Sequence, residues 1–189
     1  MLNPGTRTIE TERLTLRRYK KEDAEAVFEN WGSDPAVSKY LSWLPHSSVT
    51  VTKAYLEGIL RDYKRVDSYH WCIVLKETGQ PVGSIDVVRH NSVLNVAEIG
   101  YLIARPLWNK GCMTEALSAV LGYLFLDAGF NRVEACHHIK NLASGHVMEK
   151  AGMRFEGITR DGAKDNMGKF CDIARYAILH RDFTGRPEE

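Results

Sequence analysis

The stretch PLWNKGCMTEAL, residues 106–117, follows an apolar alternating segment and leads into a helical apolar pattern. The N-terminus of a helix exposes about four unpaired amide groups and carries roughly half a positive charge. An anion placed there is held by the main chain without need of a basic side chain. Gly111 lets the backbone approach a ligand closely, and Lys110 adds a charge at its edge. The stretch therefore predicts an anion site in a strand–turn–helix junction.

Two common phosphate-binding motifs do not fit this turn. A Walker A loop needs the pattern G-x-x-x-x-G-K-[ST], which the chain does not contain. A dinucleotide-binding fold needs G-x-G-x-x-G in a βαβ unit, whereas Gly111 is the only glycine of the turn. A nucleotide-binding switch, a kinase and a dinucleotide-binding fold are therefore disfavoured.

The composition is that of an ordinary soluble domain. The chain has 189 residues, 44% hydrophobic and 26% charged, which disfavours a disordered chain and a membrane protein. Its 25 basic and 24 acidic residues give a net charge of +1, so no nucleic acid or membrane partner is expected. Neither an apolar leader nor a run of about 18 apolar residues is present. We expect a cytoplasmic protein.

Hydrophobic periodicity predicts one α/β domain over residues 1–189. Strands are expected at 13–19, 69–76, 81–90, 95–104, 132–139, 153–160 and 170–179, and helices at 20–33, 34–41, 53–65, 113–129 and 142–152. Thr50 or Thr52 is the expected start of the third helix, and 161–169 is an expected polar turn. No repeat or low-complexity linker interrupts this order, which is typical of a mixed α/β fold.

Three segments together resemble the GCN5-related N-acetyltransferase (GNAT) family. They are AEIGY at 97–101, W-x-K-G-x-M-T-E-A at 108–116 and N-x-x-S-x-x-V-x-E-K-A-G at 141–152. The combination is specific, although each piece alone is not, and the resemblance covers about residues 8–180. It is strongest to the ribosomal-protein N-terminal (alanine or serine) acetyltransferases. It implies a mixed central sheet of about six or seven strands, flanked by helices and splayed at the cofactor site.

The resemblance implies that the anion is the diphosphate of coenzyme A. The family motif Gln/Arg-x-x-Gly-x-Gly/Ala falls on residues 108–113, where only Gly111 matches strictly. Asn109 stands where many members have glycine; a positive φ is expected there, and asparagine tolerates one better than other non-glycine residues. The implied cofactor-binding set is Ile103 (through its main chain), Trp108, Asn109, Lys110, Gly111, Cys112, Met113, Thr114, Asn141 and Ser144.

The reaction implied by the resemblance is direct transfer of an acetyl group from acetyl-CoA to a primary amine in a ternary complex. The acceptor would be a peptide or protein N-terminal α-amine, or a small amine. Because amines are largely protonated near neutral pH, a base must accept a proton. Glu98 is the candidate base, with Asp86 in reserve. Ser144 is the candidate acid for the departing thiolate, with Tyr176 as the alternative.

Each of these residues also has a simpler structural interpretation. Glu98 could pair with an arginine, and Asn141 and Ser144 could serve only as helix-start residues. The segment 30–48, rich in aromatic residues, could line an acceptor cleft or form a satellite hydrophobic cluster. Because Asn109 and Met113 depart from the motif, the alternative function is an acyl-CoA-binding protein without turnover.

No metal site is expected from the histidines or cysteines. His137 and His138 are adjacent in a predicted strand and therefore point to opposite faces, so they cannot chelate one ion together. The cysteines at 72, 112, 136 and 171 form no CxxC pair, and Cys112 is expected to be a small filler residue. Oligomeric state is not readable from the sequence, although a homodimer is common among relatives of this kind.

Overall fold

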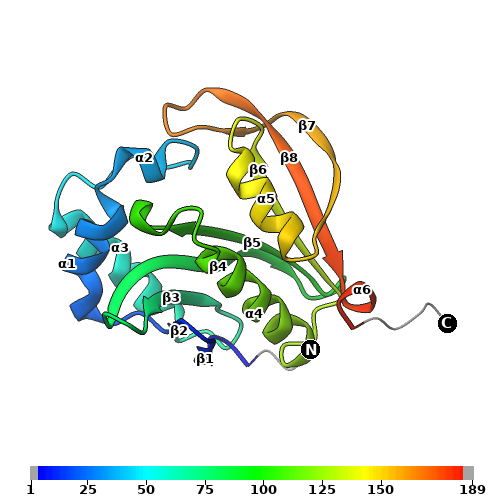
Figure 1. The fold of residues 1–189 in the computed structure, drawn as a ribbon, viewed down its shortest axis with the longest axis horizontal. Helices are drawn as coiled ribbons and strands as arrows, with labels where there is room; N and C mark the ends of the chain where they lie inside the picture. The colour runs from blue at the N-terminus through cyan, green and yellow to red at the C-terminus, as the bar shows by residue number, and fades with distance from the viewer. Residues whose placement is uncertain (1–3, 185–189) are drawn as a thin grey trace.

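Two half-sheets meet at a short parallel junction in the computed structural model, which describes residues 4–184 (Figure 1). Its single sheet has the order β1-β2-β3-β4-β5-β6-β8-β7. The strands are β1 Ile9–Glu10, β2 Leu14–Arg17, β3 His70–Leu75, β4 Gln80–Asn91, β5 Val96–Ile103, β6 Arg132–His138, β7 Arg154–Lys164 and β8 Phe170–Leu179. All seven expected strands are present, and the eighth is the two-residue β1, too short to show periodicity.

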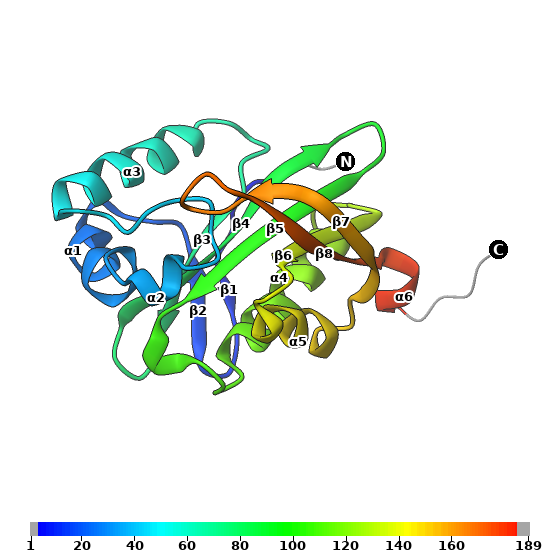
Figure 2. The same cartoon turned by 90° about the horizontal axis from the view of Figure 1, so that it is seen from above.

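The helices cover both faces of the sheet, as Figures 1 and 2 show from two directions. They are α1 Ala24–Val27, α2 Pro35–Ser38, α3 Val49–Asp62, α4 Cys112–Leu126, α5 Leu142–Lys150 and α6 His180–Thr184. α4 and α5 pack on the face that carries Ala97, Ile99 and Ile103, in the larger core cluster. α1 and α3 pack on the opposite face, in a second cluster that includes Cys72 and Val74.

The junction between β5 and β6 is the only parallel pairing of the described strands, and it is short. Its four residue pairs run from Val96 opposite Arg132 to Ile99 opposite Ala135. β5 continues to Ile103 and β6 to His138 without further pairing between them. The sheet is therefore splayed beyond Ile99, as the resemblance implied.

The helical segment after β2 differs from the single helix expected at 20–33. It is a 3-10 turn (Lys21–Asp23), then α1, then one π-helical turn (Phe28–Gly32). The wider turn is closed by Ser33, whose amide and hydroxyl both donate to the carbonyl of Phe28. A Cβ on Gly32 would lie 3.0 Å from the carbonyl oxygen of Val27, so glycine permits this packing.

Several expected element boundaries were wrong, among them the helix expected at 34–41, which spans only Pro35–Ser38. Two further differences concern α3 and β7. α3 begins at Val49, after Ser48, rather than at Thr50 or Thr52. Thr52 is instead buried within the helix, and its hydroxyl bonds His46 Nδ1 at 2.8 Å. β7 extends through part of the expected polar turn to Lys164, across two register shifts that a regular alternation does not reveal.

Glu115 fastens the start of α4 to the segment before β2. Its carboxylate accepts hydrogen bonds from the Thr11 hydroxyl at 2.6 Å and from the amide and Nε of Arg13 at 2.9 and 2.6 Å. Burial opposes ionisation of Glu115, but these hydrogen bonds outweigh it and lower its pKa. Arg13 also donates through Nη1 to the Lys110 carbonyl at 2.8 Å. Arg13 therefore connects to the turn before α4 at Lys110 and to the first turn of the helix at Glu115.

Leu121 tests the role of α4 as the central core helix. It is fully buried, whereas Leu126 on the same helix is 65% exposed. We expect Leu121→Ala to lower the free energy of unfolding by about 3 kcal/mol, because it removes buried methyl groups and leaves a cavity. Leu126→Ala is the matched control and should change it by about 0.5 kcal/mol or less. Equal effects of the two variants in urea denaturation would contradict the assigned packing.

Glu115 also predicts a pH dependence. Its folded-state pKa lies below the unfolded value of about 4.3, so its contribution is present above that pH and is lost as the pH falls through the folded pKa. We expect Glu115→Gln to cost about 1–2 kcal/mol of unfolding free energy at about pH 7. The difference from the natural chain should shrink by about pH 3. The exposed neighbour Glu12 provides the control, Glu12→Gln, and a difference independent of pH would refute the assignment.

Candidate active site

The turn before α4 presents unpaired main-chain amides. Asn109 has a φ of 59° and Gly111 a φ of 76°, so the positive φ expected at Asn109 is confirmed. The first main-chain hydrogen bond of the helix is donated by the Glu115 amide to the Gly111 carbonyl oxygen at 3.0 Å. The amides from 111 to 114 precede this bond and have no partner among the described residues. These amides and the helix dipole make the turn suited to an anion.

The departure from the family motif at Met113 also leaves the turn intact. Met113 is buried in the larger core cluster, so its side chain packs beneath the turn rather than over the amides. Cys112 is buried in the same cluster, which confirms its interpretation as a filler. A Cβ on Gly111 would meet only the Arg13 guanidinium, at 3.5 Å. The turn is thus rimmed by Arg13 and by exposed Lys110, a setting that fits a diphosphate.

Trp108 links the turn to the end of β5. Its indole Nε1 donates to the Ile103 carbonyl at 2.9 Å, while the ring remains 41% exposed. The bond fixes the turn relative to the end of β5, which extends beyond the pairing with β6 and includes Ile103, whose main chain belongs to the implied cofactor-binding set. Trp108 therefore has a defined structural role that exists before any ligand is bound.

Tyr101 and Ser144 form a hydroxyl pair on the α5 side of the splay. The Tyr101 hydroxyl donates to the Ser144 carbonyl at 2.9 Å and lies 3.0 Å from Ser144 Oγ. Because Tyr101 has one hydroxyl proton, Ser144 then donates to the Tyr101 oxygen. Burial, opposed by the bond to Ser144, raises the pKa of Tyr101, so its proton is retained at neutral pH. Ser144 is thus coupled to a second hydroxyl that the sequence analysis had not singled out.

Asn141 precedes α5, and its side chain makes no capping hydrogen bond. Asn141 is therefore the N-cap residue of α5, as its structural interpretation expected, but its side-chain amide makes no bond to the helix and is available to a ligand. Tyr176, the alternative acid, is buried on β8 and donates to Glu149 of α5 at 3.2 Å. Gly145 lies close to Tyr176: a Cβ on this glycine would lie 3.3 Å from the tyrosine oxygen.

Glu98 lies on the other face of β5, within its paired part. Arg89 on β4 contacts its carboxylate through Nε at 3.1 Å and also through Nη2. Its second oxygen lies 3.8 Å from Cys136 Sγ. The arginine pairing considered for Glu98 is therefore present. This pairing does not by itself exclude Glu98 as a base for the acceptor amine.

Asp86 lies on the same face as Glu98 and next to the splay. The register places Asp86 opposite Gly100, the first residue of β5 beyond the junction. Its carboxylate accepts from Ser84 Oγ at 2.6 Å and contacts His70 Nδ1 at 2.8 Å. The structure thus brings two carboxylates to one face of the sheet and the Tyr101–Ser144 pair to the other.

The segment 30–48 divides between the two interpretations offered for it. Trp31 is buried against α3 in the second core cluster, as a satellite cluster requires. Tyr40 instead packs on His138 of β6, with ring centroids 5.2 Å apart, and Trp43 packs on His46 at 5.4 Å. The Asn166 side chain, in the β7–β8 turn, donates to the Ser38 carbonyl at 3.0 Å. This segment therefore bridges to the second half-sheet.

His137 and His138 occupy opposite faces of β6, as expected. His137 packs on Tyr176 with ring centroids 5.6 Å apart, whereas His138 packs on Tyr40. Among residues 4–184, no group of three or more His, Cys, Asp or Glu side chains is placed to hold a metal ion. In the same range, no helix is long and apolar enough to cross a membrane.

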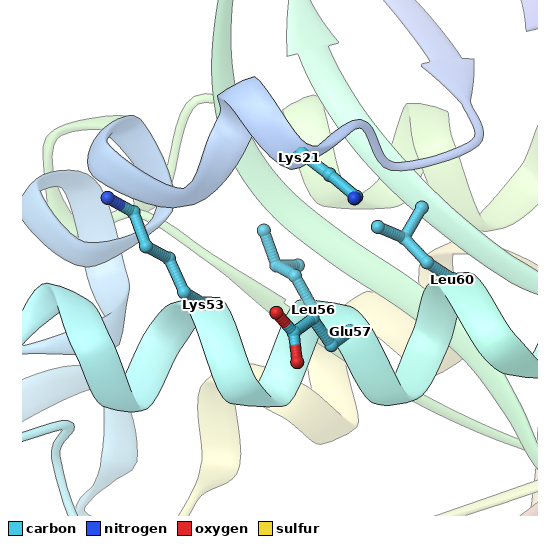
Figure 3. A pocket seen from close by; sticks show the side chains of 5 residues that line it. All are labelled: Lys21, Lys53, Leu56, Glu57 and Leu60. Atoms are coloured by element: carbon cyan, nitrogen blue, oxygen red, sulfur yellow. The ribbon is translucent and has the colours of Figure 1, made fainter.

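A pocket of about 130 Å³ lies between the 3-10 turn and α3 (Figure 3). No residue of the turn before α4 lines it. Lys21, Lys53, Leu56, Glu57 and Leu60 line it. Lys53 already faces Glu25 at 3.8 Å, and none of the candidate residues reaches this pocket. We therefore do not assign it to the active site.

Three contributors escaped the sequence analysis. Arg13 reaches the turn from a position almost a hundred residues earlier, and no local spacing announces that approach. Tyr101 lies within the AEIGY segment, but its partner becomes apparent only when α5 is placed. His70 begins β3, and only the strand register brings it beside Asp86.

Comparisons with known proteins agree with this geometry. Residues 13–154 match the model of the acetyltransferase (GNAT) domain. The uncharacterized N-acetyltransferase p20 of Bacillus licheniformis is 31% identical over 94% of this chain and 99% of its own length. The ribosomal protein uS5-alanine N-acetyltransferase of Escherichia coli is 23% identical over 93% and 92%. A solved GNAT-family acetyltransferase from Bacillus anthracis superposes with a TM-score of 0.80 and 29% identity, covering 93% and 99%.

The family model spans the turn, both carboxylates, the Tyr101–Ser144 pair and the junction of the half-sheets. Of these features, the sequence motif predicted the turn, and the family resemblance implied the splay at the junction. The match extends over most of the chain and agrees with the architecture of the solved relative. The chain therefore belongs to the GNAT family and is an acetyl-CoA-dependent N-acetyltransferase.

Proposed function

We propose that the protein transfers the acetyl group of acetyl-CoA directly to a primary amine, either the α-amine of a peptide or protein or a small amine. The observation that supports the proposal is that a turn suited to an anion lies next to the place where β5 and β6 separate. A cofactor bound on one side and an acceptor on the other would meet there. The named E. coli relative acts on a ribosomal-protein alanine, which favours a chain-terminal amine among the acceptors.

On the cofactor side, the amides from 111 to 114 would hold the diphosphate of coenzyme A, with Arg13 and Lys110 at the rim. Support comes from their lack of other partners and from the positive φ of Asn109 and Gly111. The free Asn141 amide would contact the pantetheine arm. When bound, acetyl-CoA supplies an activated acyl group, and these residues would fix its position relative to β5.

The Tyr101–Ser144 pair is the proposed source of the proton for the departing thiolate. Ser144 would turn its hydroxyl proton from the Tyr101 oxygen to the sulfur, and Tyr101, which is protonated at neutral pH, would then turn its own proton to Ser144 Oγ. On the opposite face, Glu98 and Asp86 are the two carboxylates able to accept the proton of the attacking amine. Proton transfer by positioned groups of this kind contributes roughly 10²- to 10⁴-fold to rate.

Gly111 tests the cofactor turn. We expect Gly111→Val to weaken acetyl-CoA binding by about tenfold or more in calorimetry, because a β-branched residue does not tolerate its φ of 76°. Gly79 provides the matched control: its φ is 68°, and it lies in the β3–β4 hairpin away from the turn. Gly79→Val should lose similar stability yet bind normally. If the natural chain did not bind acetyl-CoA, the proposal would fall.

The hydroxyl pair predicts a selective loss of turnover. We expect Ser144→Ala and Tyr101→Phe each to lower kcat by about 10- to 100-fold, with acetyl-CoA affinity changed by about threefold or less. The double variant should be little worse than Ser144→Ala, because the two residues act as a unit. Release of free thiol across a panel of amines and N-terminal peptides measures this. Unchanged kcat in both single variants would exclude the pair as the acid.

A further inference from the structure

A line of three residues crosses the sheet beside the splay. His70 on β3 is paired with Asp86 on β4, and Asp86 is paired with Gly100 on β5. Directly opposed residues of antiparallel strands share a face, with Cβ atoms roughly 5 Å apart. Gly100 has no side chain, and an added Cβ would meet only Val88 Cγ1, at 3.2 Å. Asp86 therefore lies opposite a residue without a side chain, at the start of the part of β5 that is not paired with β6.

Asp86 is held in place but not neutralised by a permanent cation. It takes one hydrogen bond from the Ser84 hydroxyl and one contact from His70, and its side chain remains 18% exposed. A carboxylate has about four lone-pair sites, so acceptor capacity remains. Glu98, by contrast, is contacted by two nitrogens of the Arg89 guanidinium. It also lies in the part of β5 that is still paired with β6. Of the two carboxylates, Asp86 is the better placed to receive a proton.

Two carboxylates and a tyrosine ring surround the His70 imidazole. Asp86 of β4 lies at its Nδ1 and Asp62 of α3 lies 3.7 Å from its Nε2. The Tyr63 ring packs edge-on against it at 6.1 Å, and the Tyr63 hydroxyl donates to the His70 carbonyl. Burial works against the imidazolium, but the hydrogen bond and charge of Asp86, with the charge of Asp62, outweigh it and raise the pKa of His70.

We propose that Asp86 accepts the proton of the attacking amine nitrogen, and that His70 is the positioning residue that orients this carboxylate and tunes it by its own charge. The inference rests on the proposed acetyl transfer. As the C–N bond forms and the C–S bond breaks, the nitrogen proton passes to Asp86 and the Tyr101–Ser144 pair gives a proton to sulfur. Water then removes the proton from Asp86 and restores one to the hydroxyl pair.

A charged imidazolium weakens Asp86 as a proton acceptor, so the rate should fall as the pH drops through the titration of His70. Asparagine at position 70 keeps an amide donor for Asp86 but cannot ionise. We expect His70→Asn to retain about a tenth or more of the plateau kcat and to lose the acidic limb attributable to His70. His70→Ala, which removes the donor, should lower the plateau further. Using one acceptor amine throughout makes its own titration common to all profiles.

The decisive comparison is between the two carboxylates. We expect Asp86→Asn to lower kcat by about 100-fold or more while acetyl-CoA affinity changes by about threefold or less. The decrease in kcat caused by Glu98→Gln should be smaller by a factor of about ten or more. Asp67→Asn, an acid paired with Arg65 outside this line, should keep the natural kcat. Thermal unfolding and acetyl-CoA titration verify that each variant is folded.

The outcomes separate the two proposals. If the natural chain releases thiol with an amine and Asp86→Asn does so equally fast, the assignment of Asp86 is overturned and acetyl transfer stands. A large loss in Glu98→Gln alone would transfer the role to Glu98. An unchanged acidic limb in His70→Asn would remove His70 from the proposal, even if Asp86→Asn did not fold. No thiol release by the natural chain with any amine would overturn the proposed function itself.

Discussion

The end of pairing between β5 and β6 is the constraint on which the rest of the structure depends. Four residue pairs join the half-sheets, and then β5 continues without β6 at its side. A continuous sheet separates its two faces completely, so a carboxylate on one face could not cooperate with a hydroxyl on the other. The proposed cooperation of Asp86 with the Tyr101–Ser144 pair requires this separation of the strands, because the two lie on opposite faces of the sheet.

α4 places the proposed cofactor turn within this topology. The helix connects the two parallel strands, so its N-terminus must lie at the end of β5, where the strands separate. Glu115 and Arg13 fasten the helix start, and Trp108 fastens the turn to Ile103. Because the proposed anion donors are main-chain amides, the side chains at 109 and 113 can differ from the family motif, provided that Asn109 tolerates a positive φ and Met113 packs inward.

The sequence predicted the fold well where periodicity or a special backbone demand was local. The strands, the core face of α4 and the positive φ of Asn109 all follow from short-range patterns. The π turn at Phe28–Gly32 and the irregular β7 did not, since both arise from contacts with neighbouring elements. For the site, Glu98 and Ser144 were visible in motifs. Their partners Arg89 and Tyr101, and the alignment of His70 with Asp86, depend on strand register and helix docking.

Both margins of the sheet resist further strand addition. One margin is β1, only two residues long, and the other is β7, interrupted by shifts at Phe155/Gly157 and Thr159/Ala163. β7 also carries charged residues at Arg154, Glu156, Arg160, Asp161 and Lys164. Short, bulged and charged margins disfavour edge-to-edge association. Two copies of this chain are therefore not expected to pair through the edges of their sheets. The same features disfavour assembly of the protein into extended β-structures.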